Sequence, residues 1–233
     1  MLSRVKRLLP IGYLNYYRCL KERISNNSFS GNLPAIFSEI HRTNHWKGKE
    51  SICGITSGVE ETAEMRAALQ YLWREIGVRS ILDVPCGDFA WMKEMDLNGI
   101  GYTGGDLVEK MIHENKIRYA SDEIHFEILD LTTSPLPKAD LVICRDCLVH
   151  LSFQNIHKAV ANIKASGSTW LLCTSFIKNK FNYNIKDGNW RTLNMERAPF
   201  HFPKPVKTIE EYCPFGEGVF SDKALCLWKL EDI

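Results

Sequence analysis

The sequence has little net charge, no internal repeat and no low-complexity tract. Its 233 residues contain 29 Lys and Arg against 28 Asp and Glu, so the formal net charge is only +1. Without a strong field of one sign, the chain has no general attraction for nucleic acid or acidic lipid, and we expect neither as a partner. A small-molecule partner fits this balance better. A hydrophobic content of 45% is enough to close one sizeable core.

Long apolar runs are also missing from the basic N-terminal part. Its longest apolar stretch, Leu8 to Leu14, is interrupted by Pro10 and Gly12. This stretch is too short to span a bilayer or to form the core of a signal peptide. We therefore expect a cytoplasmic protein without stable membrane insertion, with a basic helical extension at residues 1–35 and one domain at 36–233. A peripheral membrane or partner contact of the extension stays open, as does the choice between monomer and homodimer.

The eight cysteines lack the spacing of a zinc site or of a disulfide set. Cys86, Cys144, Cys173 and Cys226 lie in or at the ends of apolar β-like runs, where a reduced cysteine acts as a small core residue. Cys144 and Cys147 have CxxC spacing, but no second CxxC or His pair accompanies them. We expect free thiols, as is typical of the cytosol, and no metal site.

Strand-like and helix-like segments alternate from about residue 60 onward, which is typical of a parallel sheet covered on both faces. Apolar runs predict strands at 80–84, 101–105, 125–129, 139–144, 169–176 and 224–230. Helical periodicity predicts helices at 61–77, 107–119 and 153–165, and a helix start at 89–95. Residues 178–205 are rich in aromatic residues, Asn and Pro and have no sustained period, which predicts a long ordered loop or lid over a substrate.

Polar residues follow four of these strands in succession. Asp83 ends the first, Asp106 the second and Asp130 the third, while Arg145 and Asp146 end the fourth. In open α/β sheets, ligands bind beyond the carboxyl ends of the strands. Asp106 follows Asp83 by about 20 residues, the spacing of a carboxylate that accepts both hydroxyls of an adenosine ribose. Each acid alone could be a cap or turn residue, but one shared polar ligand explains them together.

The sequence resembles the class I, Rossmann-like S-adenosylmethionine-dependent methyltransferases in three segments: Leu82-Asp-Val-Pro-Cys-Gly-Asp-Phe, Gly101-Tyr-Thr-Gly-Gly-Asp106 and Cys144-Arg-Asp-Cys-Leu-Val-His150-Leu. Within that family it is similar to a bacterial subgroup that often accompanies surface-polysaccharide genes. The family's first turn reads Asp/Glu-x-Gly-x-Gly-x-Gly, and of its three glycines this sequence has only one, Gly87. The resemblance implies a doubly wound, mostly parallel sheet of seven strands with an antiparallel C-terminal strand and helices on both faces.

The resemblance also implies a site for S-adenosylmethionine, with S-adenosylhomocysteine as the product. Gly87 and its neighbours would face the methionine end, Asp106 the ribose, and Asp130 with Leu131 the adenine. Pro85 removes one N–H and fills the space that a pyrophosphate would need, which disfavours a dinucleotide. Family members usually cover the cofactor with a segment that corresponds to residues 42–54. The expected cofactor residues are Trp46, Asp83, Pro85, Cys86, Gly87, Asp106, Leu107, Asp130, Leu131, Arg145 and Asp146.

A methyl transfer to a hydroxyl requires alignment for an in-line displacement and a group that removes the proton. His150 and Asp146 are the candidates, because both follow the fourth strand at the ligand-binding edge. His150 has the pKa range suited to a base near neutrality. A packed histidine that holds the loop is an equally open interpretation, and Asp146 suits a ligand role better than that of a base.

Four residues of the long loop are the predicted acceptor contacts: Trp190, Arg191, Asn194 and His201. Aromatic faces beside such donors suit a sugar or a phosphorylated sugar, so we expect O-methylation of a small carbohydrate-like or polysaccharide-precursor molecule. Three alternatives stay open: methylation of a nitrogen, methylation of a phosphate-type oxygen, and a non-catalytic cofactor-binding module in a biosynthetic complex. The aromatic residues could also simply pin the loop to the body of the protein.

Overall fold

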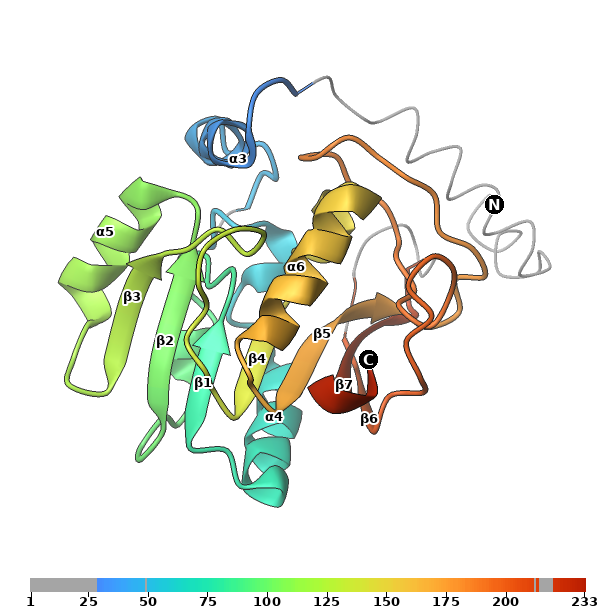
Figure 1. Ribbon diagram of the computed structural model, residues 1–233. Helices are drawn as coiled ribbons and strands as arrows, with labels where there is room; N and C mark the ends of the chain where they lie inside the picture. The colour runs from blue at the N-terminus through green and yellow to red at the C-terminus, as the bar shows by residue number, and fades with distance from the viewer. Residues whose placement is uncertain (1–28, 49, 212, 214–219) are drawn as a thin grey trace, which may run out of the picture.

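The computed structural model describes residues 29–48, 50–211, 213 and 220–233 (Figure 1). Most of the predicted extension, residues 1–28, lies outside the described residues. Helix α3 (Leu33–Arg42) spans residue 36, where the sequence predicts the boundary between extension and domain, and that division stays a prediction. This helix begins where Asn32 caps the backbone N–H of Ala35 and a proline occupies the first turn.

Seven strands form one sheet in the order β3-β2-β1-β4-β5-β7-β6. Their bounds are Ser80–Asp83 (β1), Gly101–Asp106 (β2), Ile124–Ile128 (β3), Leu141–Cys144 (β4), Trp170–Phe176 (β5), Lys207–Glu210 (β6) and Lys223–Lys229 (β7). The first five pair in parallel, whereas β7 runs antiparallel to both β5 and β6. The predicted doubly wound, mostly parallel seven-stranded sheet is confirmed.

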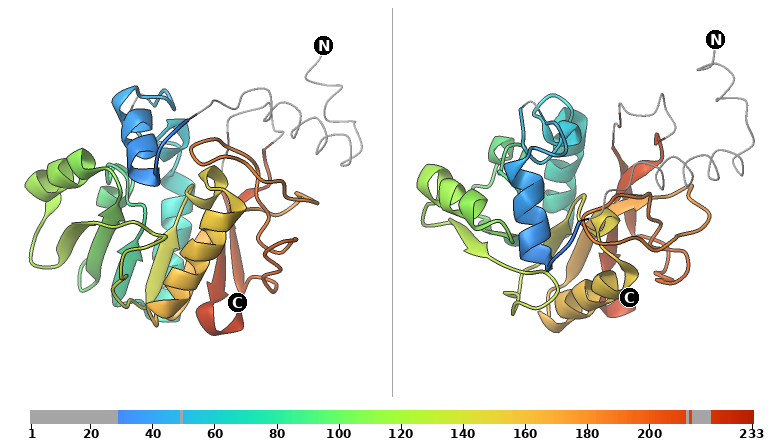
Figure 2. Two further views of the ribbon diagram at one scale, coloured as in Figure 1. Left: turned by 45° about the horizontal axis from the view of Figure 1, so that its top comes forward. Right: turned by 90° about the horizontal axis from the view of Figure 1, so that it is seen from above.

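Helices cover both faces of this sheet (Figures 1 and 2). Helix α6 (Phe153–Ala165) packs its buried residues against the face that contains Leu82 and Val142. Helices α4 (Ala63–Ile76) and α5 (Glu109–Tyr119) pack against the opposite face, which contains Ile81 and Ile143. Successive strand residues thus enter different cores, as the two-residue period of a strand requires. Helix α3, blue in Figure 1, lies beyond the carboxyl ends of the central strands.

The predicted helices 61–77, 107–119 and 153–165 and the six predicted strands agree with the structure to within two residues at each end. Residues 178–205 contain neither helix nor strand, as predicted. The helix start expected at 89–95 is wrong, because only the 3₁₀ turn Met92–Glu94 forms there. Phe89 has φ +61, a left-handed conformation that cannot begin a right-handed helix. No helix within the described ranges is long and apolar enough to cross a membrane.

Candidate active site

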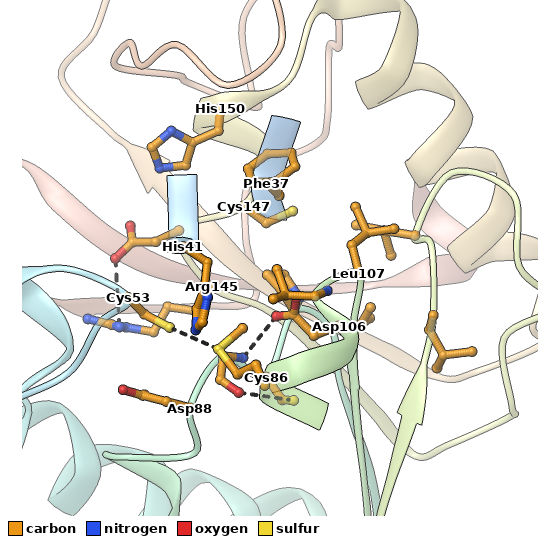
Figure 3. Close-up of a pocket in the computed structure, with 18 of the residues that line it drawn as sticks. Phe37, His41, Cys53, Cys86, Asp88, Asp106, Leu107, Arg145, Cys147 and His150 are labelled. Carbon is orange, nitrogen blue, oxygen red and sulfur yellow. Dashed lines mark hydrogen bonds and ion pairs between the residues drawn. The ribbon is translucent and has the colours of Figure 1, made fainter. Parts of the chain in front are cut away.

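A hollow lies beyond the carboxyl ends of β1, β2 and β4, and we call it the central hollow (Figure 3). Its labelled side chains in Figure 3 come from α3, the segment between α3 and α4, the turn after β1, the end of β2 and the turn after β4. Phe37 and His41 of α3 contribute to its lining, as does Cys53. It brings together ten of the residues predicted to bind a cofactor: Trp46, Pro85, Cys86, Gly87, Asp106, Leu107, Asp130, Leu131, Arg145 and Asp146.

The turn after β1 requires glycine at one position. Gly87 has φ +58, and a Cβ placed on it would lie 2.6 Å from Sγ of Cys53. The N–H of Gly87 donates to Asp106 Oδ2 at 3.2 Å, and Asn115 Nδ2 donates to the Gly87 carbonyl at 2.8 Å. The turn is therefore held against both β2 and α5, and the Cys53 thiol packs where a side chain at position 87 would begin.

Asp106 is buried at the end of β2, where Oδ1 accepts the N–H of Val108 at 3.0 Å. Burial raises the pKa of Asp106 to about 6, although N–H groups of the turn and of α5's start partly offset this effect. A carboxylate has about four lone-pair positions, so Asp106 keeps acceptor capacity toward the hollow. Asp130 also accepts hydrogen bonds from its own turn: its Oδ1 accepts from the N–H and the hydroxyl of Thr132 at 2.7 and 2.6 Å.

Asp83 is the one expected cofactor residue that does not line the central hollow. Its side chain shares the sheet face of Ile81, because strand residues alternate, and Tyr102 donates its hydroxyl to Asp83 Oδ2 at 2.9 Å. Burial raises the pKa of Asp83 to about 7. The cofactor contact of Asp83 stays a prediction, and in the structure this carboxyl lies in the core beside Tyr102.

Four charged side chains form a buried cluster beside the hollow, which we call the charge cluster: Arg145, Asp146, Glu211 and Lys223. Arg145 Nε lies 2.7 Å from Glu211 Oε1, and Lys223 Nζ lies 2.6 Å from Asp146 Oδ2. Cross-pairs of 3.5 Å (Lys223 to Glu211) and 3.7 Å (Arg145 to Asp146) complete it. Sequence reasoning missed Glu211 and Lys223, since a charge next to an apolar strand normally indicates a solvated strand end.

Asp146 is the member of the charge cluster that is most exposed, at 24% of its side chain. It also adopts φ +51, a left-handed conformation that is costly for a residue with a Cβ. Burial alone would raise the pKa of Asp146, but Lys223 and Arg145 outweigh burial and hold it below the usual range. Asp146 is therefore ionised and weakly basic, which favours the ligand role over that of the base, and both roles stay predictions.

His150 lies in a 3₁₀ turn, Leu148–His150, after β4. Its Nδ1 is 2.9 Å from the carbonyl oxygen of Asn189, which can only accept, so Nδ1 carries the proton and Nε2 has a free lone pair. Burial lowers the pKa of His150 to about 4, and the imidazole is neutral at pH 7. The indole of Trp46 lies against it, with ring centroids 4.8 Å apart.

A second hollow, which we call the side hollow, shares Trp46, Cys53, Asp146 and His150 with the central hollow. Aromatic rings form much of its wall. Among them, Trp190 packs edge-on against Phe220 and Phe176, with ring centroids 5.1 and 5.9 Å apart. Thr56 and Lys223 add polar atoms. Trp190, a predicted acceptor contact, lines the side hollow, and His150 lies at the junction of the two hollows.

The other three predicted acceptor residues lie elsewhere. Arg191 is fully buried and donates to the carbonyls of Leu148, Val149, Leu151 and Tyr183. Asn194 is buried and donates to the Asn179 carbonyl at 2.9 Å. His201 is exposed and lines neither hollow. Arg191 and Asn194 satisfy backbone carbonyls of the buried loop and its surroundings, so the structure does not bring them or His201 to either hollow, and their acceptor contacts stay predictions.

The seven described cysteines are all free thiols, including Cys144 and Cys147 of the CxxC segment. Burial raises the pKa of Cys53 and of Cys86 well above the usual value, so both are neutral in the central hollow. Over the part of the chain that the structure describes, no cluster of three or more His, Cys, Asp or Glu side chains could hold a metal ion.

Comparisons with known proteins agree with this arrangement. Residues 81–166 match a family described as a methyltransferase domain. Human N-acetylserotonin methyltransferase in complex with SAM has a similar structure, with a TM-score of 0.53 and 15% identity over 94% of this chain and 67% of that one. N-methyltransferase NodS from Bradyrhizobium japonicum, in complex with SAH, gives 0.54 and 15% over 72% and 86%. Magnesium protoporphyrin IX methyltransferase from Synechocystis, with bound SAM, gives 0.52 and 12% over 95% and 97%. No curated protein matches the chain.

Proposed function

We propose that this chain, a S-adenosylmethionine-dependent methyltransferase by its domain and its fold, methylates a hydroxyl of a small carbohydrate-like or polysaccharide-precursor molecule. The observation that carries the proposal is His150, which is neutral, protonated at Nδ1 and shared by both hollows. A hydroxyl acceptor needs a base at this position, whereas a purely binding module does not.

The residues that line the central hollow support this cofactor site. The turn at Gly87 lines it with a left-handed backbone, φ +58, and a Cβ there would collide with Sγ of Cys53. Asp106 would accept the ribose hydroxyls, and Asp130 with the backbone of Leu131 would bind the adenine. Trp46, Pro85, Cys86, Leu107 and the Arg145–Asp146 pair complete the proposed cofactor set. When bound there, S-adenosylmethionine supplies an electrophilic methyl group on a positively charged sulfur.

His150 would accept the hydroxyl proton at Nε2 while the acceptor oxygen attacks the methyl carbon. The imidazolium formed by this step would be stabilised by the ionised carboxylate of Asp146, which already acts electrostatically on His150. A pKa of about 4 means that His150 is available as a base throughout the neutral range, at the cost of lower basicity. The hollow must then contribute mainly by aligning the two reactants.

The side hollow supports a ring-shaped, hydroxyl-bearing acceptor. Trp46 and Trp190 offer flat apolar surfaces of the kind on which one face of a sugar packs, and Thr56 with Asp146 offers hydrogen-bonding groups. One observation favours a second candidate, N-methylation: the ionised Asp146 reaches both hollows and would accept a hydrogen bond from an amine. NodS, a similar fold, is named an N-methyltransferase. For an amine acceptor, His150 need not remove a proton.

The test begins with a mass-spectrometric screen of neutral sugars, amino sugars and nucleotide sugars for a product with one added methyl group. With an acceptor found, His150→Gln should lower kcat by a factor of about 10² or more and change the Kd for S-adenosylmethionine less than twofold. His157→Gln, at an exposed position of α6, is the matched control and should leave both unchanged. Equal loss of turnover and cofactor affinity would mean that His150 is structural, and full turnover with an amine product would favour N-methylation.

A further inference from the structure

The long loop is hydrogen-bonded to the turn that carries His150. Arg191 donates from Nη1 to the carbonyls of Leu148 and Val149 at 3.1 and 2.8 Å, and from Nη2 to that of Leu151 at 2.8 Å. Its backbone N–H adds a further bond to Val149 at 3.2 Å. One guanidinium thus binds carbonyls on both sides of His150 in the chain.

The same loop holds His150 itself through two consecutive residues. The N–H of Gly188 donates to the His150 carbonyl at 2.9 Å, and the carbonyl of Asn189 accepts from His150 Nδ1 at 2.9 Å. Asp187 ties the loop to the start of α6, since Oδ1 accepts the N–H of Ser152 at 2.7 Å. Backbone and ring of His150 are therefore both held by segment 187–191.

We propose that Arg191 is a positioning residue, which through segment 187–191 fixes the His150 ring in the Nδ1–H form and so keeps the Nε2 lone pair available at the junction of the two hollows. This proposal rests on the proposed function, in which Nε2 is the proton acceptor. It replaces the acceptor-binding role that the sequence suggested for Arg191. Arg191 is buried and lines neither the central hollow nor the side hollow. It therefore acts only through His150.

An arginine suits this role better than a lysine for geometric reasons. The three carbonyls require donors that diverge from one rigid plane, and only a guanidinium supplies such a fork. Charge contributes as well: burial is the main cause of the lowered pKa of His150, and Arg191 and His45 lower it further, whereas the Asn189 carbonyl and Asp146 raise it. The indole of Trp46 also packs against the His150 ring.

The experiment uses the full chain with ¹⁵N-labelled histidine and long-range ¹H–¹⁵N correlation spectra, and His150→Gln assigns the signal. In the wild type we expect a neutral His150 at pH 7 with a protonated Nδ1 and an unprotonated Nε2. In Arg191→Lys we expect a mixture of the two neutral forms and a titration midpoint nearer the ordinary value of about 6.5. Arg197→Gln, at an exposed position of the same loop, is the control and should match the wild type.

A proton on Nε2 in the wild type, or an unchanged His150 signal in folded Arg191→Lys, would overturn the proposal. Because a fully buried arginine is replaced, thermal melting and cofactor calorimetry must first show that the variant is folded. If it is not, Asp187→Ala removes the acceptors of Ser152 and Asn155 and loosens the same segment from a half-buried position, and there an unchanged His150 signal is equally decisive. Failure of the proposed function looks different: the tautomer is as expected, yet His150→Gln keeps full turnover.

Discussion

Lys223 is the residue through which the charge cluster is most readily tested. Its side chain is only 3% exposed, with Nζ 2.6 Å from Asp146 Oδ2 and 3.5 Å from Glu211 Oε2. Lys223→Met keeps an unbranched apolar stem and removes the charge. The cluster then holds two carboxylates and one guanidinium, a net buried charge of −1.

The size of the effect follows from the balance of attraction and desolvation. At 2.6 Å and an effective dielectric constant of about 20, the gross attraction of the Lys223–Asp146 pair is roughly 6 kcal/mol. Part of it is recovered, because Arg145 still lies 3.7 Å from Asp146 and 2.7 Å from Glu211. Removing one partner of a buried pair typically costs about 3–5 kcal/mol, since the other charge stays buried. We expect Lys223→Met to lower the free energy of unfolding by this amount.

Urea unfolding at constant pH measures this loss, and a second substitution identifies its cause. Adding Glu211→Gln removes one negative charge and restores neutrality, so the double variant should be more stable than the sum of the two single effects predicts, by about 1–3 kcal/mol. Lys229→Met, at the exposed end of β7 with Glu231 at 3.4 Å, is the control and should cost less than about 1 kcal/mol. A Lys223→Met effect as small as that control, or strict additivity in the double variant, would refute the reasoning.

Three further predictions concern the first turn and its surroundings. Asp106→Ala should weaken S-adenosylmethionine binding in calorimetry at least about tenfold, because hydrogen bonds to a charged group contribute about 1.5–3 kcal/mol; unchanged affinity would contradict the ribose role. Gly87→Ala should lower both the melting temperature and the cofactor affinity, since its Cβ would lie 2.6 Å from Cys53 Sγ, whereas Gly77→Ala, with φ +68 but no atom within 4 Å, should cost only about 1–2 kcal/mol. Between pH 3.8 and about 7, Asp83 binds more protons in the folded than in the unfolded state. The stabilisation from this group is therefore lost as the pH rises, with a slope of at most roughly 1.4 kcal/mol per pH unit. Asp83→Asn should remove that slope, and a difference in unfolding free energy between wild type and variant that stays constant with pH in urea unfolding would contradict this.

The fold was predictable where burial imposes a pattern on the sequence. Strand β4 is buried on both faces, and its continuous apolar run, Leu141–Cys144, identified it directly. Strand β6 lies at the sheet edge with only Ile209 buried, so it leaves no run to recognise. Helix α3 was missed although a signal exists: Asn32 is a cap, and the buried residues of the helix recur at positions 33, 36 and 40 with helical spacing.

The site was predictable to the extent that it depends on strand ends. Asp106, Asp130 and the Arg145–Asp146 pair meet at one edge because the carboxyl ends of parallel strands lie side by side. Glu211 and Lys223 could not be found this way, since their position depends on β6 and β7 pairing in antiparallel orientation at the far side of β5. Such long-range order is a tertiary property that local sequence does not specify.

The loop at 178–205 shows that polar residues in a long segment can serve the backbone rather than a ligand. A buried segment without helix or strand has carbonyls that no regular ladder satisfies, so its own side chains must donate to them. Asn179, Asn182, Arg191 and Asn194 all do so. Among the described hydrogen bonds, the Trp190 side chain donates to no carbonyl, and its ring lines the side hollow. In this loop the amide and guanidinium groups are thus engaged with the backbone, and Trp190 is the predicted acceptor contact whose side chain the structure places at a hollow.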